Sequence, residues 1–518
     1  MKKILRALIS VSDKTNIIEL ASLLKKYNVE IISTGGTAKL FIEHSIPVIQ
    51  VSDYTGHPEI LDGRVKTLHP RIHGGILGKR NDINHTETMK KNNINEIDLV
   101  IVNLYPFQST IAREDCTLDL AIENIDIGGP TMIRAAAKNY NSVAVLTDPN
   151  DYDKFSKEFI RENGSVSSEY KFKLAKKAFM HTALYDSAIS NYLTGLNQED
   201  EELPAQLIQV MNKNLDMRYG ENPHQTAAFY KEPNIVKGSL SNFIQVQGKA
   251  LSFNNLNDAD TAWECVKNFS EPSCVIVKHA NPCGVCSANN NLLAYQGAFA
   301  TDPTSSFGGI ISFNKKLDEK TAELIIKQFS EVIIAPDYSK EALSVFSKKT
   351  NIRVLKVPLF ENNNQLDFKK IGGGWLVQNL DKHQLNINEC KVVTKLKPTP
   401  EELIEMKFAW QVAQYVKSNA IIFTKNNKTI AIGAGQMSRI DSTIIATIKA
   451  KNAGLSLSDS VVASDAFFPF RDGIDLLAKY GAKCVIQPGG SIKDDEVVKA
   501  ANEHKLVMLF TNIRHFKH

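Results

Sequence analysis

Short apolar runs alternate with amphipathic segments along the first part of the chain. Residues 7–11, 30–33, 98–103 and 142–146 are apolar runs of strand length. Between the first two, residues 16–26 place Ile17, Leu20, Leu23 and Leu24 on one helical face. Residues 34–37 are predicted to form a tight turn before another helix. This alternation predicts an α/β domain in which helices surround a parallel sheet.

The pattern is interrupted once and then resumes. Residues 194–204 are charged and turn-rich, so the main boundary is predicted there, between a domain of residues 1–198 and a domain of residues 199–518. In the second part, residues 275–277 predict a short strand, residues 420–423 and 429–432 a hairpin, and residues 484–486 another strand. Two similar α/β subdomains would fit this part, and no short-period repeat is found.

Composition narrows the class of protein. The 518 residues are 43% apolar and 23% charged, and this balance suits two or three globular domains. Lys and Arg total 61 against 57 Asp and Glu, so the net charge of +4 gives no reason to expect nucleic acid as a partner. No run of about 18 apolar residues predicts a membrane span, and the first apolar run is too short for a signal peptide. Seven scattered cysteines indicate a reduced, cytoplasmic location.

Phosphate-binding groups follow the first two predicted strands. Ser10, Ser12 and Lys14 follow one strand, and a Ser-Thr-Gly-Gly-Thr segment at residues 33–37 follows the next. Glycines let backbone N–H groups approach an anion, and ligands of open α/β sheets gather at the carboxyl ends of strands. A Gly-Gly turn by itself is more often an ordinary turn.

Three further clusters lie at predicted strand ends or in loops. Residues 63–70 bring two cations, a hydroxyl and an imidazole together, although a solvated basic loop is the alternative. Residues 103–107 read Asn-Leu-Tyr-Pro-Phe, and residues 126–131 read Asp-Ile-Gly-Gly-Pro-Thr and lead to Arg134 and Lys138. The clusters together favour a site for an anionic nucleotide.

These motifs closely resemble one family, the bifunctional AICAR transformylase/IMP cyclohydrolases of purine biosynthesis. The resemblance implies an N-terminal domain with the fold of methylglyoxal synthase, which closes the ring of the formamido ribonucleotide with loss of water to give IMP. The residues that it assigns to the ribonucleotide and its phosphate are Ser10, Ser12, Lys14, Ser33, Thr34, Gly36, Thr37, Arg64, Thr67 and Asn103. Around the cyclising centre it sets Lys66, Tyr105, Asp126 and Lys138, with the backbone N–H groups of Ile127 and Gly128 as oxyanion donors. The sequence does not show which of these residues acts as the acid and which acts as the base.

A second group of polar motifs lies beyond the predicted boundary. Residues 218–225 combine Arg, Tyr, Asn, His and Gln, with a polar turn as the alternative. Lys278 and His279 end a predicted strand before an Asn-Pro turn. Histidine carries protons near neutral pH, and a neighbouring lysine cation would help to keep the ring neutral and able to act as a base.

The second group resembles the transformylase half of the same family, which implies formyl transfer from 10-formyltetrahydrofolate to the amine of AICAR. His279 is then the base, Lys278 its partner, and Asn419 orients the formyl oxygen. The nucleotide residues that the resemblance implies are Arg218, Tyr219, Asn255, Phe307, Gly308, Glu331, Arg514 and His518; some members have Asp at the position of Glu331. For the folate it implies Phe468, Phe470 and Asp472, with core packing as the alternative for the aromatic run. It also implies two cytidine-deaminase-like subdomains, a homodimer with transformylase sites at the subunit interface, no catalytic metal and, in some members, a structural potassium ion.

Three rival interpretations explain less of the chain. Residues 282–286 read Pro-Cys-Gly-Val-Cys, which is half of a zinc-deaminase signature, but no His-x-Glu or Cys-x-Glu triplet precedes it in its own predicted domain. A nucleotide-binding regulator would not need Lys278, His279 and Asn419 as a set. A methylglyoxal-synthase-like lyase would account for the first domain only.

Overall fold

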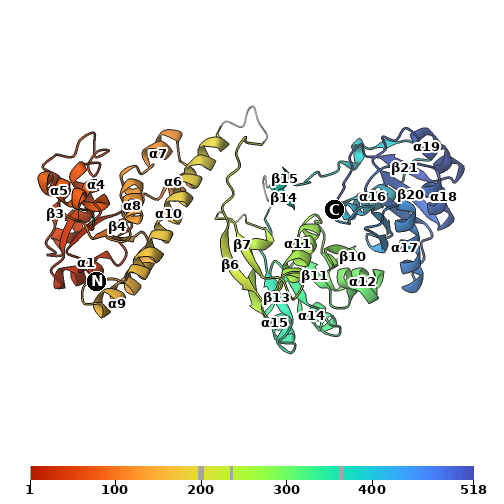
Figure 1. The fold of residues 1–518 in the computed structure, drawn as a ribbon. Helices are drawn as coiled ribbons and strands as arrows, with labels where there is room; N and C mark the ends of the chain where they lie inside the picture. Colours follow the sequence, from red (N-terminus) through yellow and green to blue (C-terminus); the bar gives the residue numbers. More distant parts are fainter. Residues whose placement is uncertain (1, 197–202, 234–236, 361–365) are drawn as a thin grey trace. The chain divides into compact units, whose positions relative to one another are not determined.

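The computed structural model describes residues 2–196, 203–233, 237–360 and 366–518 (Figure 1). The chain divides into two compact units, Met1–Val210 and Met211–His518. The boundary predicted between residues 198 and 199 lies outside the described residues.

The first unit is built on a parallel five-stranded sheet with the order β3-β2-β1-β4-β5. All five residues of β4 are buried, since helices cover both faces of the sheet and a strand in such a position must be apolar throughout. The strands are β1 (Arg6–Val11), β2 (Glu30–Ser33), β3 (Ile49–Gln50), β4 (Leu99–Asn103) and β5 (Ala144–Leu146). The parallel sheet predicted from the apolar runs is therefore confirmed.

Ten helices accompany this sheet in the described residues. Figure 1 shows α10, the longest of them, beside α8. They are α1 (Ile17–Lys26), α2 (Gly35–Glu43), α3 (Val51–Thr55), α4 (Pro70–Leu77), α5 (Ile83–Lys91), α6 (Phe107–Ile111), α7 (Leu118–Glu123), α8 (Gly128–Lys138), α9 (Tyr152–Arg161) and α10 (Ser168–Gly195).

The tight turn predicted at residues 34–37 is wrong in one respect. Thr34 is extended, and Gly35 already begins α2. Gly35 has a φ of +42°, a value that glycine adopts without a steric penalty, so the chain passes from strand to helix within one residue. The glycines therefore belong to the first turn of a helix, whose N-terminus faces the strand ends.

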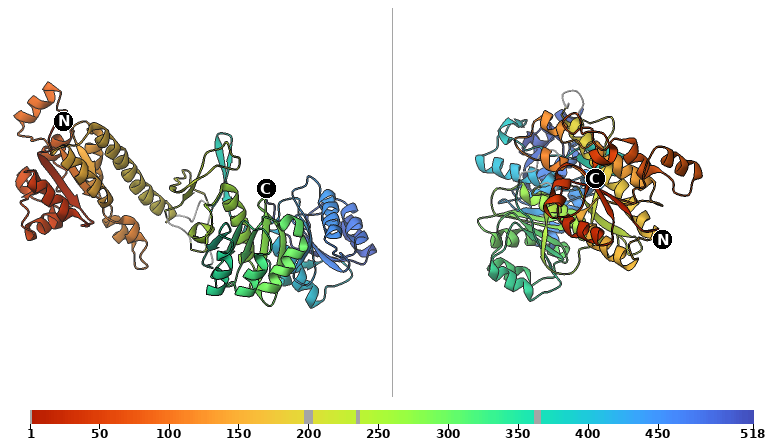
Figure 2. Two further views of the ribbon diagram at one scale, coloured as in Figure 1. Left: turned by 90° about the horizontal axis from the view of Figure 1, so that it is seen from below. Right: turned by 90° about the vertical axis from the view of Figure 1, so that its left-hand side faces the viewer.

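The second unit contains two six-stranded mixed sheets with the same topology (Figures 1 and 2). One has the order β10-β9-β11-β12-β13-β8 and the other β18-β17-β19-β20-β21-β16, and the parallel and antiparallel pairings agree at every step. The first sheet comprises β8 (Ile244–Gln247), β9 (Ser273–Lys278), β10 (Asn281–Ser287), β11 (Ile310–Phe313), β12 (Val332–Ala335) and β13 (Arg353–Lys356). The second comprises β16 (Lys391–Val392), β17 (Ile421–Thr424), β18 (Thr429–Gly433), β19 (Ser460–Ser464), β20 (Ala482–Gln487) and β21 (Val507–Phe510). The two predicted α/β subdomains are confirmed as a structural repeat.

Equivalent helices connect the strands of the two repeats. The first repeat contains α11 (Phe253–Lys267), α12 (Asn291–Thr301), α13 (Pro303–Ser306), α14 (Glu319–Ile325) and α15 (Lys340–Ser347), and the second contains α16 (Pro400–Ala413), α17 (Arg439–Asn452), α18 (Asp472–Lys479) and α19 (Asp494–Glu503). Two further ribbons, β6 (Asn212–Met217) with β7 (Ala227–Lys231) and β14 (Leu366–Ile371) with β15 (Gly374–Asn379), lie outside the sheets. None of the described helices is long and apolar enough to cross a membrane.

The repeats meet along β10 and β18. Cys286 and Lys428 form an antiparallel bridge there. The Thr429 hydroxyl accepts from the Val285 N–H at 2.9 Å and donates to the Val285 carbonyl at 3.1 Å. Side-chain and main-chain bonds thus join two edge strands that would otherwise present unpaired backbone groups.

Candidate active sites

Polar side chains converge at the carboxyl ends of three adjacent strands in the first unit. The hydroxyls of Ser10 and Thr34 are 3.0 Å apart, and Lys14 Nζ donates to Thr37 Oγ1 at 3.0 Å. Asn103, at the end of β4, accepts from the N–H groups of Ser12 and Asp13 at 2.5 and 2.9 Å. The edge of the sheet thus presents hydroxyls and a cation together, which is the chemistry that a phosphate requires.

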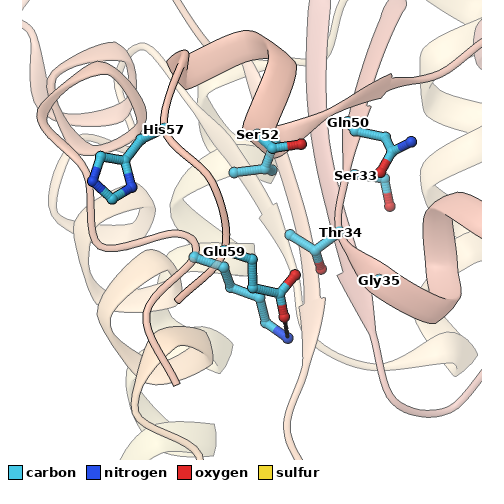
Figure 3. Close-up of a pocket in the computed structure, with 9 residues that line it drawn as sticks. Ser33, Thr34, Gly35, Gln50, Ser52, His57 and Glu59 are labelled. Atoms are coloured by element: carbon cyan, nitrogen blue, oxygen red, sulfur yellow. Dashed lines mark hydrogen bonds and ion pairs between the residues drawn. The ribbon is translucent and has the colours of Figure 1, made fainter. Parts of the chain in front are cut away.

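A pocket adjoins this edge (Figure 3). Figure 3 shows Thr34 and Glu59 facing the same space, with a dashed line from the Glu59 carboxylate to a nitrogen that belongs to Lys66, 3.5 Å away. The residues that line it are Ser33, Thr34, Gly35, Gln50, Val51, Ser52, His57, Glu59 and Lys66. Gln50, Ser52, His57 and Glu59 were not predicted as site residues.

Asp126 lies within reach of two other predicted members of the cyclising centre. Its carboxylate accepts from the Gly129 N–H at 2.7 Å. Burial raises the pKa of Asp126, while backbone N–H groups of Gly129 and Tyr105 and the charge of Lys66 oppose the rise. The structure therefore brings Lys66, Tyr105 and Asp126 together around one partly buried carboxyl.

The N-terminus of α8 completes this region. A Cβ added to Gly128 would lie 2.8 Å from Thr67 Oγ1, so only a residue without a side chain allows that approach. The first N–H groups of a helix have no partner within the helix, which leaves those around Ile127 and Gly128 able to serve an oxyanion. Lys138 ends α8, about 15 Å along the helix axis from Gly128, and no contact with Lys66, Tyr105 or Asp126 occurs among the described interactions. Arg64 is mostly exposed and pairs with Glu123.

The second unit places Lys278 against the loop that follows α13. Lys278 Nζ donates to the carbonyls of Phe307 and Gly308 at 2.9 and 3.2 Å. Gly308 has a φ of +68°, and a Cβ there would lie 3.2 Å from the same Nζ. The predicted residues Lys278, Phe307 and Gly308 are thus brought together, and the Phe307 ring is 61% exposed.

His279 stands in the turn between β9 and β10. It is exposed, and both His279 and Ala280 have positive φ, at 55° and 53°. The Asp258 carboxylate on α11 accepts from their backbone N–H groups at 3.2 and 2.7 Å. Asp258 was not predicted as a site residue. The signal that could have identified it is the repeat: Asp258 is the sixth residue of α11, as Glu405 is of α16.

Asn419 comes from the other repeat and reaches the same region. Lys417 N–H donates to Asn281 Oδ1 at 3.0 Å, which joins the segment before Asn419 to the strand after His279. Asn419 Nδ2 donates to the Gln436 carbonyl at 2.9 Å. The C-terminal tail supports this loop, since Ser418 and Lys517 exchange two hydrogen bonds.

The other predicted nucleotide residues differ in their surroundings. Asn255 is buried and forms a capping box with Ser252 at the start of α11, one turn before Asp258. Glu331 pairs with Arg353 at 2.6 Å, and its backbone N–H donates to the Gly309 carbonyl. Four further residues have no contact with Lys278 or His279 among the described interactions: Arg218, Tyr219, Arg514 and His518. Tyr219 is half-buried, and the other three are exposed.

The aromatic run near residue 468 has one ring in the core and another on the surface. Phe468 is 1% exposed and its ring lies against Gly473 in the core. Phe470 is 54% exposed, and Asp472 is exposed at the start of α18. Residues 465–471 form a loop between β19 and α18, so no strand or helix period tells from the sequence which of these rings is buried.

The cysteines of the zinc-like motif are core residues. Cys283 and Cys286 lie on β10 and are 7% and 4% exposed. Burial raises the pKa of the Cys283 thiol to about 12 and that of Cys286 to about 11, so both stay protonated near neutral pH. No group of three or more His, Cys, Asp or Glu side chains that could hold a metal occurs in the described part of the chain.

Comparison with known proteins finds a family match in each part of the chain. Residues 16–131 match the family of MGS-like domains, and residues 136–449 match the family described as the AICARFT/IMPCHase bienzyme. Among solved structures, a chain described as "Crystal structure of ForH" is 35% identical over 36% of this chain and 98% of that chain, with a TM-score of 0.33. Because the bienzyme family covers more than half of the 518 residues, this chain belongs to the bifunctional AICAR transformylase/IMP cyclohydrolase family, which uses 10-formyltetrahydrofolate as formyl donor and performs the final steps of purine synthesis.

Proposed function

We propose that the two activities are divided between two domains, cyclisation in residues 1–198 and formyl transfer in residues 199–518. The match to MGS-like domains, which ends at residue 131, supports the first assignment. The bond between Lys417 N–H and Asn281 Oδ1 carries the other assignment, because it joins the segment before Asn419 to the strand that follows His279.

Cyclisation requires the carboxamide nitrogen to attack the formyl carbon, with loss of water. An amide is a poor nucleophile, so a fixed geometry has to supply much of the acceleration, about 7–11 kcal/mol in well-oriented intramolecular reactions. The ribonucleotide and its phosphate would be held by Ser10, Ser12, Lys14, Ser33, Thr34, Gly36, Thr37, Arg64, Thr67 and Asn103. Lys66, Tyr105 and Asp126 would surround the reacting atoms, and the N–H groups at Ile127 and Gly128 would receive the developing oxyanion. Lys138, at the far end of α8, would act only at the outer edge of this site.

Formyl transfer requires a base for the weakly nucleophilic amine of AICAR. His279 would remove the proton as the amine attacks the formyl carbon. Lys278, held by two carbonyls, and Asn419 would stabilise the carbonyl oxygen on which charge develops. The nucleotide would contact Arg218, Tyr219, Asn255, Phe307, Gly308, Glu331, Arg514 and His518, while Phe470 and Asp472 would face the folate and Phe468 would support them from the core.

Single substitutions separate the two activities. His279→Ala is expected to abolish formyl transfer and to leave cyclisation of added formamido nucleotide intact, and Lys66→Ala the reverse. Formation of tetrahydrofolate and of IMP is followed by absorbance in the same preparation. Two exposed residues, His504 and Lys26, provide matched controls as His504→Ala and Lys26→Ala. Loss of both activities in either folded variant would overturn this division.

A homodimer is part of the proposal. The β14–β15 ribbon exposes Ile371, Trp375 and Leu376 at 44%, 56% and 56%, and it has no third strand among the described residues. An isolated two-stranded ribbon is only marginally stable in water, so a second subunit would both cover these side chains and support the ribbon. Sedimentation equilibrium of the parent and of a Trp375→Ser, Leu376→Ser double variant tests this, and a parent that sediments as a monomer would refute it.

Two further points complete the proposal. A cytoplasmic location is supported by the seven cysteines, all of them free.

A structural potassium ion would have to be held largely by neutral oxygens, because the described residues form no cluster of metal-binding side chains. Thermal unfolding in potassium chloride against choline chloride tests for the ion, and equal midpoints would exclude it.

A further inference from the structure

The turn that carries His279 has a counterpart in the other repeat. His279 and Ala280 lie between β9 and β10, and Asn426 and Asn427 lie between the equivalent strands β17 and β18. All four residues have positive φ, at 55°, 53°, 58° and 51°. Both turns therefore have the left-handed backbone of a tight two-residue hairpin.

An acidic side chain binds each turn in the same way. The sixth residue of α11, Asp258, accepts from the N–H groups of His279 and Ala280 at 3.2 and 2.7 Å. The sixth residue of α16, Glu405, accepts from the Asn427 N–H at 2.7 Å and also from the Asn426 N–H. In each repeat the acid precedes the first turn residue by the same number of positions. The acid is thus a common device of the repeat, which holds the turn to the preceding helix.

The two turns differ in the residues that occupy them. Asparagine adopts left-handed backbone readily, and Asn-Asn is a favourable sequence for such a turn. Histidine also tolerates this backbone, but Ala280 carries the ordinary steric cost of the left-handed conformation. Unfavourable backbone that persists in one copy of a repeat is expected where a function requires it, and His279 is the base of the proposed transfer.

We propose that Asp258 is a positioning residue for formyl transfer, and this rests on the proposed function of His279. Its carboxylate fixes the two turn N–H groups, which holds His279 and Ala280 in left-handed conformation and so directs the imidazole towards the amine of AICAR. Asp258 does not exchange a proton with the substrate. Glu405 performs the same structural task on a turn whose side chains have no part in the reaction.

The test compares Asp258→Ala with Glu405→Ala in the full-length protein. We expect Asp258→Ala to lower kcat for formyl transfer about 10- to 100-fold, since a misplacement of about 1 Å can cost 100-fold, with KM for AICAR changed less than about twofold. Glu405→Ala removes the matching bonds and should leave kcat within about twofold. Asp258→Asn retains one acceptor oxygen, so its kcat for formyl transfer should lie between those of Asp258→Ala and the parent. Asp258→Asn takes the place of Asp258→Ala if the alanine variant does not fold.

A rescue experiment distinguishes positioning from direct chemistry. Ala280→Gly restores left-handed preference without the carboxylate, because glycine adopts positive φ without a Cβ penalty. In the Asp258→Ala background it should recover at least about fivefold in kcat. No recovery, or a kcat of Asp258→Ala within twofold of the parent, would overturn the proposal. His279→Ala is measured alongside: if that variant retained formyl transfer, the assignment of the base would fail, which is a different result from failure of the positioning role.

Discussion

The backbone N–H of Lys417 donates to Asn281 Oδ1 at 3.0 Å, and this bond crosses from one structural repeat to the other. Asn281 is the first residue after the His279 turn, and Lys417 precedes Asn419 by two positions. Residues that are far apart in the sequence thus reach one region because two edge strands, β10 and β18, lie side by side. The candidate transformylase site depends on this junction as much as on its own side chains.

Loss of the bond between Lys417 N–H and Asn281 Oδ1 should therefore lower formyl transfer more than it lowers the stability of the protein. Asn281→Ala removes a hydrogen bond worth about 0.5–1.5 kcal/mol, and we expect formyl transfer to slow by up to about tenfold. Cyclisation should be unchanged. Asn388→Ala, at an exposed position of the same unit, is the matched control. Full transfer activity in Asn281→Ala would show that the junction does not determine the geometry of the site.

The buried threonine at the same junction should be important for stability. Thr429→Val removes the hydroxyl that both accepts from and donates to the Val285 backbone, and it leaves a buried N–H without a partner. Such a loss costs about 1–3 kcal/mol in the free energy of unfolding. Urea denaturation measures it, with Thr350→Val on the surface as control. Equal midpoints for the two variants would contradict the bonding seen here.

The raised pKa of Asp126 predicts a pH dependence of stability. Burial raises the pKa in the folded state, so the native protein binds more protons than the unfolded chain between the ordinary aspartate value, about 4, and the raised one. Stability should therefore fall as pH rises through this window, relative to Asp126→Asn, which does not titrate. The difference in free energy of unfolding between the two proteins, measured at several pH values from about 4 to 7, checks this. A difference independent of pH would mean that the carboxyl is not buried as described.

The ion pair in the first pocket should weaken substrate binding. Glu59 competes with an anionic nucleotide for Lys66, 3.5 Å away, and both side chains are partly exposed. Pairs of this kind contribute about 0–1 kcal/mol, so Glu59→Gln should lower KM for the formamido nucleotide by up to about fivefold. Asp153→Asn, which breaks an exposed pair with Lys157 elsewhere in the unit, should not change KM. A higher KM in Glu59→Gln would indicate that Glu59 itself contacts the substrate.

Local features of the fold followed directly from the sequence. The apolar runs at residues 7–11 and 98–103 identified the strands β1 and β4, because a strand buried on both faces must be apolar along its length. The hairpin of β17 and β18 was predicted for a similar reason. The Gly-Gly segment was assigned to a turn rather than to the start of α2, because both structures tolerate glycine there.

The site was recovered only in part. Lys66, Asp126, Lys278 and Asn419 lie in motifs whose letters carry the chemistry. Asp258 was missed since it resembles an ordinary acid on a helix surface. Its bonds to the N–H groups of His279 and Ala280 form only because α11 packs against the turn after β9.

The sequence by itself determined the strands, because strand burial and helical periodicity are properties of neighbouring positions, and its motifs indicated the family and the candidate residues through their resemblance to known proteins. Tertiary structure decided which of those residues meet: it buried Phe468 while exposing Phe470, separated Lys138 from Asp126 by the length of α8, and set Asp258 beneath His279. The reason is physical. Sheet order and the packing of helices on a sheet are determined by burial of surfaces that lie far apart along the chain, and no local pattern encodes them.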